Sequence, residues 1–200
     1  MLGEIEHVVV IVAAAITAIA AVLGVSTWRR QLRGQAHYEA ARSTLRAVYR
    51  VRDAVAMVRS PFMSSGERAS ALAEVEPDPK NPLDETREGS IRAMAAGYQV
   101  RWRAVASAMS DLDLARVEAE ALWGSEVVEC LAAIRRCVHE LNAALTMYLQ
   151  RQRKAWRGKA PTSHDEEIER IVFGAGDDEF QGKVRAAVET AEAFLRPKLK

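Results

Sequence analysis

Apolar residues recur along most of this chain at intervals of three and four, the spacing that places side chains on one face of an α-helix. One such series within residues 28–59 consists of Tyr38, Ala41, Leu45, Val48, Val51, Val55 and Val58. Ser60 and Pro61 follow this series and are expected to end the helix. Nothing alternates apolar and polar residues for long enough to predict a β-strand, so the pattern predicts an all-α fold.

A second helix is predicted from about Asp84, a suitable N-cap residue. Its core stripe is Ile91, Met94, Tyr98, Trp102, Val105, Met109 and Leu112. Between the two helices, residues 60–84 are rich in Ser, Gly, Glu and Pro, which predicts a loop. Part of Glu67 to Glu74 is a candidate for a short helix inside this loop.

The third helical region has the most regular pattern, an apolar seam that steps alternately by four and three as in coiled coils. The seam is Val127, Leu131, Ile134, Val138, Leu141, Leu145 and Tyr148. Such a seam needs a partner helix, so these residues are predicted to form a helix–helix interface. Leu114 to Trp123 just before it also have a helical pattern, and Gly124 with Ser125 is expected to kink or interrupt the element.

Two shorter helices are predicted after a linker at residues 157–163. Ser163 and Glu166 have capping-box spacing ahead of a helix that reaches about Phe173. The last helix is stopped by Pro197, and its apolar positions are Phe180, Val184, Ala187, Val188, Ala191, Phe194 and Leu195. Three long helices and this shorter one predict an antiparallel four-helix bundle with coiled-coil-like packing.

The N-terminal segment differs from the rest because it is apolar all round. Val8 to Val25 holds no charged residue, and His7 to Trp28 extends the run to about 22 residues, or ~33 Å of helix, enough to cross a bilayer core. We therefore expect residues 1–28 to be a transmembrane anchor that continues into a helical domain at 29–200. The alternative is a cleaved signal peptide that releases a secreted helical domain, but Glu4 and Glu6 replace the basic residues that usually precede one.

The flanks of this run predict its orientation. Trp28, Arg29, Arg30 and Arg33 are the expected membrane-interface residues, and positive charge favours the cytoplasmic side. The predicted localisation is the inner (plasma) membrane, as a single-pass protein with its N-terminus outside and its C-terminal domain in the cytoplasm. A helix continuous across residue 28 would either couple movements of the anchor and the bundle or, as we expect, serve as a rigid stalk.

Two stretches add a resemblance. WRRQLRGQAHYEAARSTLRAVYRVRDA, from Trp28 to Ala54, and AVETAEAFLRPKL, from Ala187 to Leu199, resemble uncharacterised bacterial membrane-anchored helical proteins. The resemblance covers part of the chain and includes no catalytic motif. It implies a bacterial inner-membrane setting and no activity.

Local charge is more informative than the net charge of +1. Arg42, Arg46 and Arg50 form a stripe at four-residue spacing, which we expect to pair with acidic residues in 111–129 and 165–192, in preference to an external anionic ligand. A second basic cluster, Arg151 to Lys159, includes Trp156 and has the composition of a weak phosphate-backbone binder. Because cations also complement the C-terminal end of a helix, we expect that structural role and no nucleic-acid partner.

The sequence lacks the common catalytic motifs GxxxxGK[ST], GxGxxG, GxSxG and HExxH. Cys130 and Cys137 are interpreted as small packing residues. We therefore predict no enzyme and no catalytic, cofactor-binding or metal site, no cofactor and no small-molecule substrate. The predicted function is a membrane-tethered helical interaction or scaffold protein, whose partners are the lipid bilayer and a protein partner or a second copy. The alternative is a membrane effector or signal transducer that acts through oligomerisation of its transmembrane helix.

Overall fold

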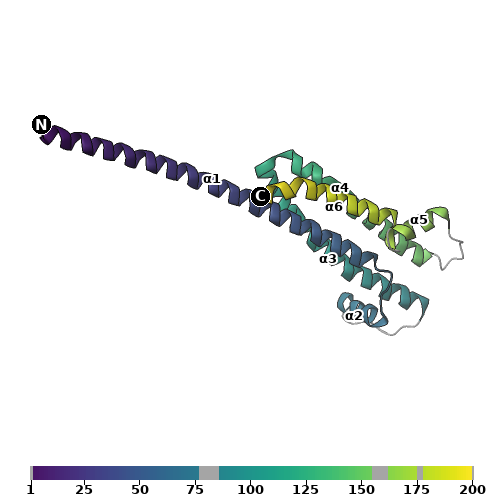
Figure 1. The fold of residues 1–200 in the computed structure, drawn as a ribbon. Helices are drawn as coiled ribbons and strands as arrows, with labels where there is room; N and C mark the ends of the chain where they lie inside the picture. Colours follow the sequence, from purple (N-terminus) through teal and green to yellow (C-terminus); the bar gives the residue numbers. More distant parts are fainter. Residues whose placement is uncertain (1, 77–85, 155–161, 175–177, 200) are drawn as a thin grey trace.

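The computed structural model describes residues 2–76, 86–154, 162–174 and 178–199, with side chains at Ala21 and from Leu23 onward. The regular elements of this part are all helical, which confirms the predicted fold class (Figure 1). They are α1 (Leu2–Arg59), α2 (Ser65–Val75), α3 (Arg87–Trp123), α4 (Ser125–Lys154), α5 (Ser163–Val172), α6 (Glu179–Leu195) and the 3₁₀ helix η2 (Arg196–Leu199).

The four long helices α1, α3, α4 and α6 form an antiparallel bundle. Contacts between α1 and α3 join His37 to Trp123 near one end and Arg50 to Asp111 further along, so the two helices run in opposite directions. The helices α3 and α4 pack together, as do α4 and α6, and α6 returns to α1. This ring of neighbours is the predicted helical bundle (Figure 1).

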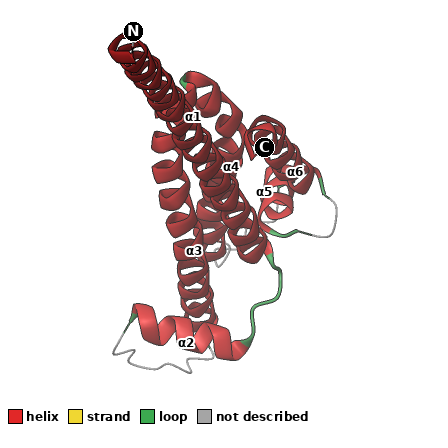
Figure 2. Cartoon of the chain, turned by 60° about the vertical axis from the view of Figure 1, so that its left-hand side comes forward, coloured by secondary structure: helices red, strands yellow, loops and turns green. Residues whose placement is uncertain are grey.

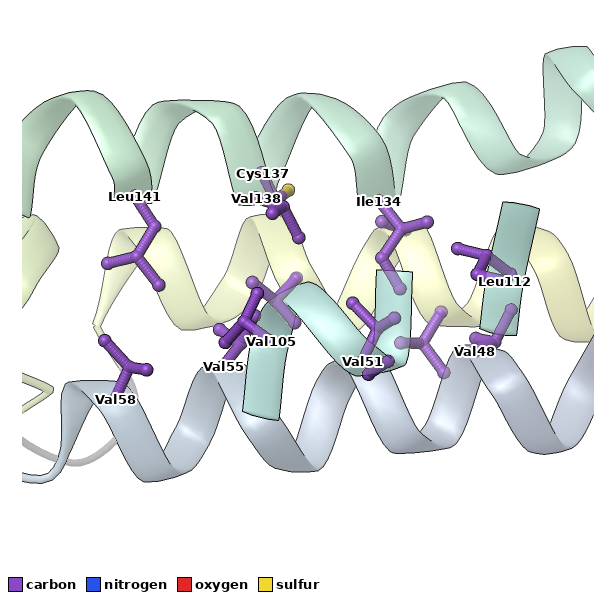
Figure 3. Close-up of a cluster of buried hydrophobic side chains, with 14 of the residues drawn as sticks. Val48, Val51, Val55, Val58, Val105, Leu112, Ile134, Cys137, Val138 and Leu141 are labelled. Carbon is purple, nitrogen blue, oxygen red and sulfur yellow. The ribbon is translucent and has the colours of Figure 1, made fainter. Parts of the chain in front are cut away.

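The core of the bundle is made by the apolar stripes of its long helices. Figure 3 shows Val48, Val51 and Val55 of α1 opposite Ile134 and Leu141 of α4, with residues of α3 between them. All five side chains are almost completely buried. Each such side chain contributes on the order of 1.5–3 kcal/mol by leaving water, so the bundle rests on its predicted apolar stripes.

The seam on α4 lies entirely inside the bundle. Its seven residues are all buried: Val127, Leu131, Ile134, Val138, Leu141, Leu145 and Tyr148. The helices that pack against α4 are α3, α5 and α6 of the same chain. The partner helices that the seam requires are therefore present within one chain.

Two boundaries differ from the predicted ones. Helix α3 runs without a break from Arg87 to Trp123, so Leu114 to Trp123 belong to the second long helix and not to the third. The interruption lies at Gly124, whose φ of 68° is open to glycine and strained for other residues. At its start, α3 is capped by Thr86, whose hydroxyl accepts a hydrogen bond from the Gly89 amide at 3.1 Å, whereas Asp84 lies outside the described residues.

Short helices complete the ends of the bundle. Helix α2 falls within the predicted loop 60–84, is capped by the Ser64 hydroxyl and packs across α3 (Figure 2). The capping box at the start of helix α5 lies one residue earlier than predicted. Thr162 and Asp165 form it, in place of Ser163 and Glu166. Most of the predicted linker 157–163 lies outside the described residues.

The predicted localisation requires a correction. Within the described residues, no helix has a stretch long and apolar enough to cross a membrane. Such a stretch needs about 20 apolar residues, and the described side chains of α1 reach Arg29 and Arg30 soon after Ala21. By this finding, the prediction of a single-pass inner-membrane protein is wrong. Most side chains of the predicted anchor, residues 1–28, lie outside the described part.

Candidate interaction surface

The most distinctive feature of the molecule is the point at which α1 leaves the bundle (Figure 1). Trp123, at the end of α3, donates a hydrogen bond from Nε1 to Nδ1 of His37 on α1 at 2.7 Å. The Trp123 ring also meets Phe194 edge-on at 5.9 Å, and the Lys198 ammonium lies 4.2 Å from the Phe194 ring centre. These contacts from α3, α6 and η2 fix the direction in which α1 extends.

Beyond this point α1 continues as a helix that exposes a row of apolar side chains. Val25, Trp28 and Leu32 follow one another at spacings of three and four and are all exposed, with Trp28 at 62%. We call these three residues the α1 ridge. The predicted membrane-interface residues Arg29, Arg30 and Arg33 are exposed on the same segment, beside Trp28.

A shallow groove of about 190 Å³ separates α1 from α3 within the bundle. Its α1 wall holds Ser43, Arg46, Ala47 and Arg50, and its α3 wall holds Asp111, Leu114, Ala115 and Glu118. The walls therefore carry charges of opposite sign.

The ridge and the groove lie on the same side of α1. Val25, Trp28 and Leu32 each stand 18 residues before Ser43, Arg46 and Arg50 respectively, and 18 residues make about five turns of an α-helix. The ridge is consequently the direct continuation of the α1 wall.

The α3 wall adds exposed apolar area to this side of the molecule. Leu114 is 65% exposed and Val117 is 56% exposed, three residues apart on the same helix. We define the α1–α3 face as the α1 ridge, Arg46, Leu114, Val117 and Glu118. Exposed apolar side chains beside charged ones are typical of sites that bind other proteins.

The arginine stripe on α1 is only partly neutralised inside the chain. Arg50 forms an ion pair with Asp111 across the groove, as the charge pattern predicts. Arg42 and Arg46 have no ion-pair partner among the described residues, and Asp113 of α3 pairs with Arg135 of α4. Glu118 on the facing wall likewise has no partner within the described part, so the face keeps free charges of both signs.

The second basic cluster has a structural role at its first residue. Arg151, near the end of α4, lies 3.4 Å from Asp165 and 3.2 Å from Glu169 of α5. Those ion pairs hold α5 against α4. Arg153 is exposed on α4, and residues 155–161, which carry the end of the cluster, lie outside the described part.

Two buried arginines at the opposite end of the bundle are structural residues that the sequence interpretation missed. Arg59 is 3% exposed and donates to the Ile171 carbonyl, the Arg170 carbonyl, Gln181 and Asp178.

Arg101 is also buried, and it donates to both carboxylate oxygens of Glu67 and to the carbonyls of Met57, Ser60 and Phe62. This ion pair holds the pKa of Glu67 below its usual range. A sequence signal exists for both arginines, since Arg59 follows Val55 by four and Arg101 lies three after Tyr98, which are core positions.

The two cysteines are buried in the core. Burial raises the pKa of the Cys130 thiol to about 11 and also raises the pKa of Cys137. Neither thiol is poised to act as a nucleophile near neutral pH. No group of three or more potential metal ligands occurs among the described residues.

The chain was compared with protein families, with curated proteins and with solved structures, and none of the three comparisons finds a match. The α1–α3 face is therefore interpreted from its own chemistry.

Proposed function

We propose that this protein is a helical interaction or scaffold protein that acts by binding, without catalysis, and that the α1–α3 face is its binding surface. The observation that carries the proposal is the exposure of Trp28, in line with the α1 wall of the groove, and of Leu114 on the α3 wall, with Val117 exposed three residues after Leu114. Large apolar side chains in water cost about 1.5–3 kcal/mol each relative to burial, so covering this face is favourable. Tryptophan is also enriched among the residues that dominate binding energy.

The dimensions of the face suit a protein partner. From His37 to Arg50, where α3 lies beside it, the α1 helix rises ~20 Å and the two helices present a width of ~18–20 Å; from Val25 to His37, α1 alone adds ~18 Å at a width of ~10 Å. The resulting area of roughly 550 Å² per copy, or about 1,100 Å² for two partners, exceeds the ~1,000 Å² expected of a specific interface. The Arg46 and Glu118 side chains at the groove would orient the partner through charge.

Site-specific photo-crosslinking tests this proposal. A photoreactive benzoylphenylalanine replaces Leu114 in the full-length chain, in the cells that produce the protein. We expect crosslinked species that contain a second polypeptide, because the side chain at this position points away from the core.

The matched control carries the same probe at Thr190, an exposed position on α6. The proposal requires crosslinks at Leu114 that are absent at Thr190. Equal yields of the same products at both positions, or no product at Leu114, would contradict it.

A further inference from the structure

We propose that the partner of the α1–α3 face is a second copy of this chain, related to the first by a two-fold axis that runs along the groove, parallel to α1 and α3. This inference rests on the proposed function and specifies its partner.

The argument begins with the heights of the charged residues along the bundle. Helices α1 and α3 are antiparallel, and the Thr44 hydroxyl lies 3.5 Å from the Ala115 carbonyl oxygen. Arg46, two residues after Thr44, and Glu118, three residues after Ala115, therefore stand within about two helical turns of each other on opposite walls. Both remain without an ion-pair partner in the described part of the chain.

A two-fold axis along the groove brings Arg46 and Glu118 together at two symmetric contacts. Rotation by 180° places the basic α1 wall of each copy over the acidic α3 wall of the other. Arg46 of each copy then faces Glu118 of the second copy, which gives two identical ion pairs. A face that carries free charges of both signs on parallel walls is self-complementary in this orientation and in few others.

The apolar residues of the face agree with the same axis. Leu114 lies exposed on the α3 wall of the groove, and Ser43 and Ala47 lie on the α1 wall. In the dimer, Leu114 of each copy packs against the small side chains of Ser43 and Ala47 of the other copy. An axis parallel to α1 makes the extended parts of α1 leave both bundles in the same direction, and Trp28, on the same side of α1 as Arg46, then lies on the side of α1 that faces the second copy. Such a contact is closed, because each copy uses the same surface, and it yields a dimer and not a filament.

Charge reversal provides the test. The protein mass of the full-length chain is measured by size-exclusion chromatography with multi-angle light scattering. We expect twice the chain mass of 22.1 kDa for the unmodified protein. Arg46→Glu and Glu118→Arg should each weaken association at least about tenfold, because each places like charges together at both symmetric contacts.

An equimolar mixture of the two variants is the decisive sample. In a mixed dimer, the glutamate at position 46 of one chain faces the arginine at position 118 of the other, and the remaining pair is unchanged. We therefore expect the mixture to recover the dimer that neither variant forms alone. Damage to folding cannot produce this recovery.

Arg136→Glu and Glu129→Arg serve as matched controls, because both residues are exposed on α4, away from the groove. These variants should dimerise like the unmodified chain. The inference is overturned if the unmodified chain is monomeric, if the variants at 46 and 118 dimerise unimpaired, or if their mixture stays monomeric.

The crosslinking result separates the two proposals. A monomeric chain whose Leu114 probe captures a different protein excludes self-association and supports the proposed function. A monomeric chain whose Leu114 probe captures nothing contradicts both.

Discussion

Replacement of Arg59 by methionine is predicted to destabilise the whole bundle although it removes no apolar core residue. Its guanidinium donates to the carbonyls of Ile171 at 2.8 Å and Arg170 at 3.0 Å, and to the Asp178 carboxylate at 2.8 Å. Asp178 itself caps α6 by accepting a hydrogen bond from the Gln181 amide. One side chain at the end of α1 therefore fixes the end of α5 and the start of α6.

The expected magnitude follows from burial. The Arg59 side chain is 3% exposed and its Asp178 partner 20% exposed, so the charges are largely removed from water. Removing one partner of a buried pair typically costs about 3–5 kcal/mol, because the other charge stays buried and unpaired. The Arg59→Met variant should lose an amount in this range, a large share of the roughly 5–15 kcal/mol that stabilises a typical domain.

Urea unfolding followed by far-ultraviolet circular dichroism at 222 nm measures the loss as a change in the free energy of unfolding. Arg103→Met is the matched control, since the Arg103–Glu74 ion pair has both side chains about half exposed and should contribute less than about 1 kcal/mol. If the two variants lose equal stability, or if Arg59→Met loses less than about 1 kcal/mol, the role assigned to Arg59 is incorrect.

Three further predictions concern other parts of the bundle. Gly124→Ala should lower the free energy of unfolding by about 1–3 kcal/mol in the same urea assay, because an alanine Cβ meets no neighbour there and the whole cost is the strain of a positive φ; an unchanged value would refute this. Cys130, with a pKa of about 11, should react with Ellman's reagent at pH 8 roughly a hundredfold more slowly in the folded protein than in urea, and rapid reaction of the folded protein would contradict the burial. The pKa of Glu67 is depressed by Arg101, so its contribution to stability is present above the unfolded pKa of about 4.3 and is lost as pH falls through the lower folded value. Glu67→Gln should accordingly be less stable than the unmodified chain at pH 7, with a difference that narrows below about pH 4; a difference independent of pH would exclude this ion pair as its cause.

The bundle could be predicted from the sequence because its core uses strictly periodic apolar residues. Val48, Val51 and Val55 on α1 and the α4 seam all occupy the interior, as their spacing predicts. Periodicity identifies the buried side of each helix without any knowledge of its neighbours. The helix ends at Arg59 and Trp123 were also predictable, from Pro61 and from Gly124.

The buried arginines and the α1–α3 face required the three-dimensional arrangement. The spacing after Tyr98 places Arg101 on the core side of α3, but its role follows only from the carbonyls of Met57, Ser60 and Phe62, which accept its hydrogen bonds from α1 and the loop that follows. The helical pattern around Leu114 gives no reason to expect an exposed side chain. Its exposure depends on which side of α3 is covered by α1. Contacts between distant segments decide both cases, and sequence spacing does not encode them.

The arrangement of α1 separates the stability of the bundle from its predicted association. Val48 is buried on one side of this helix, whereas Arg46, two residues earlier, is exposed on the opposite side. Substitutions at Arg46 therefore leave the core packing unaltered, and surface changes of this kind usually shift stability by less than about 0.5 kcal/mol. A loss of dimer in the Arg46→Glu variant, accompanied by an unchanged urea transition of the monomeric state, would consequently report on the α1–α3 face alone.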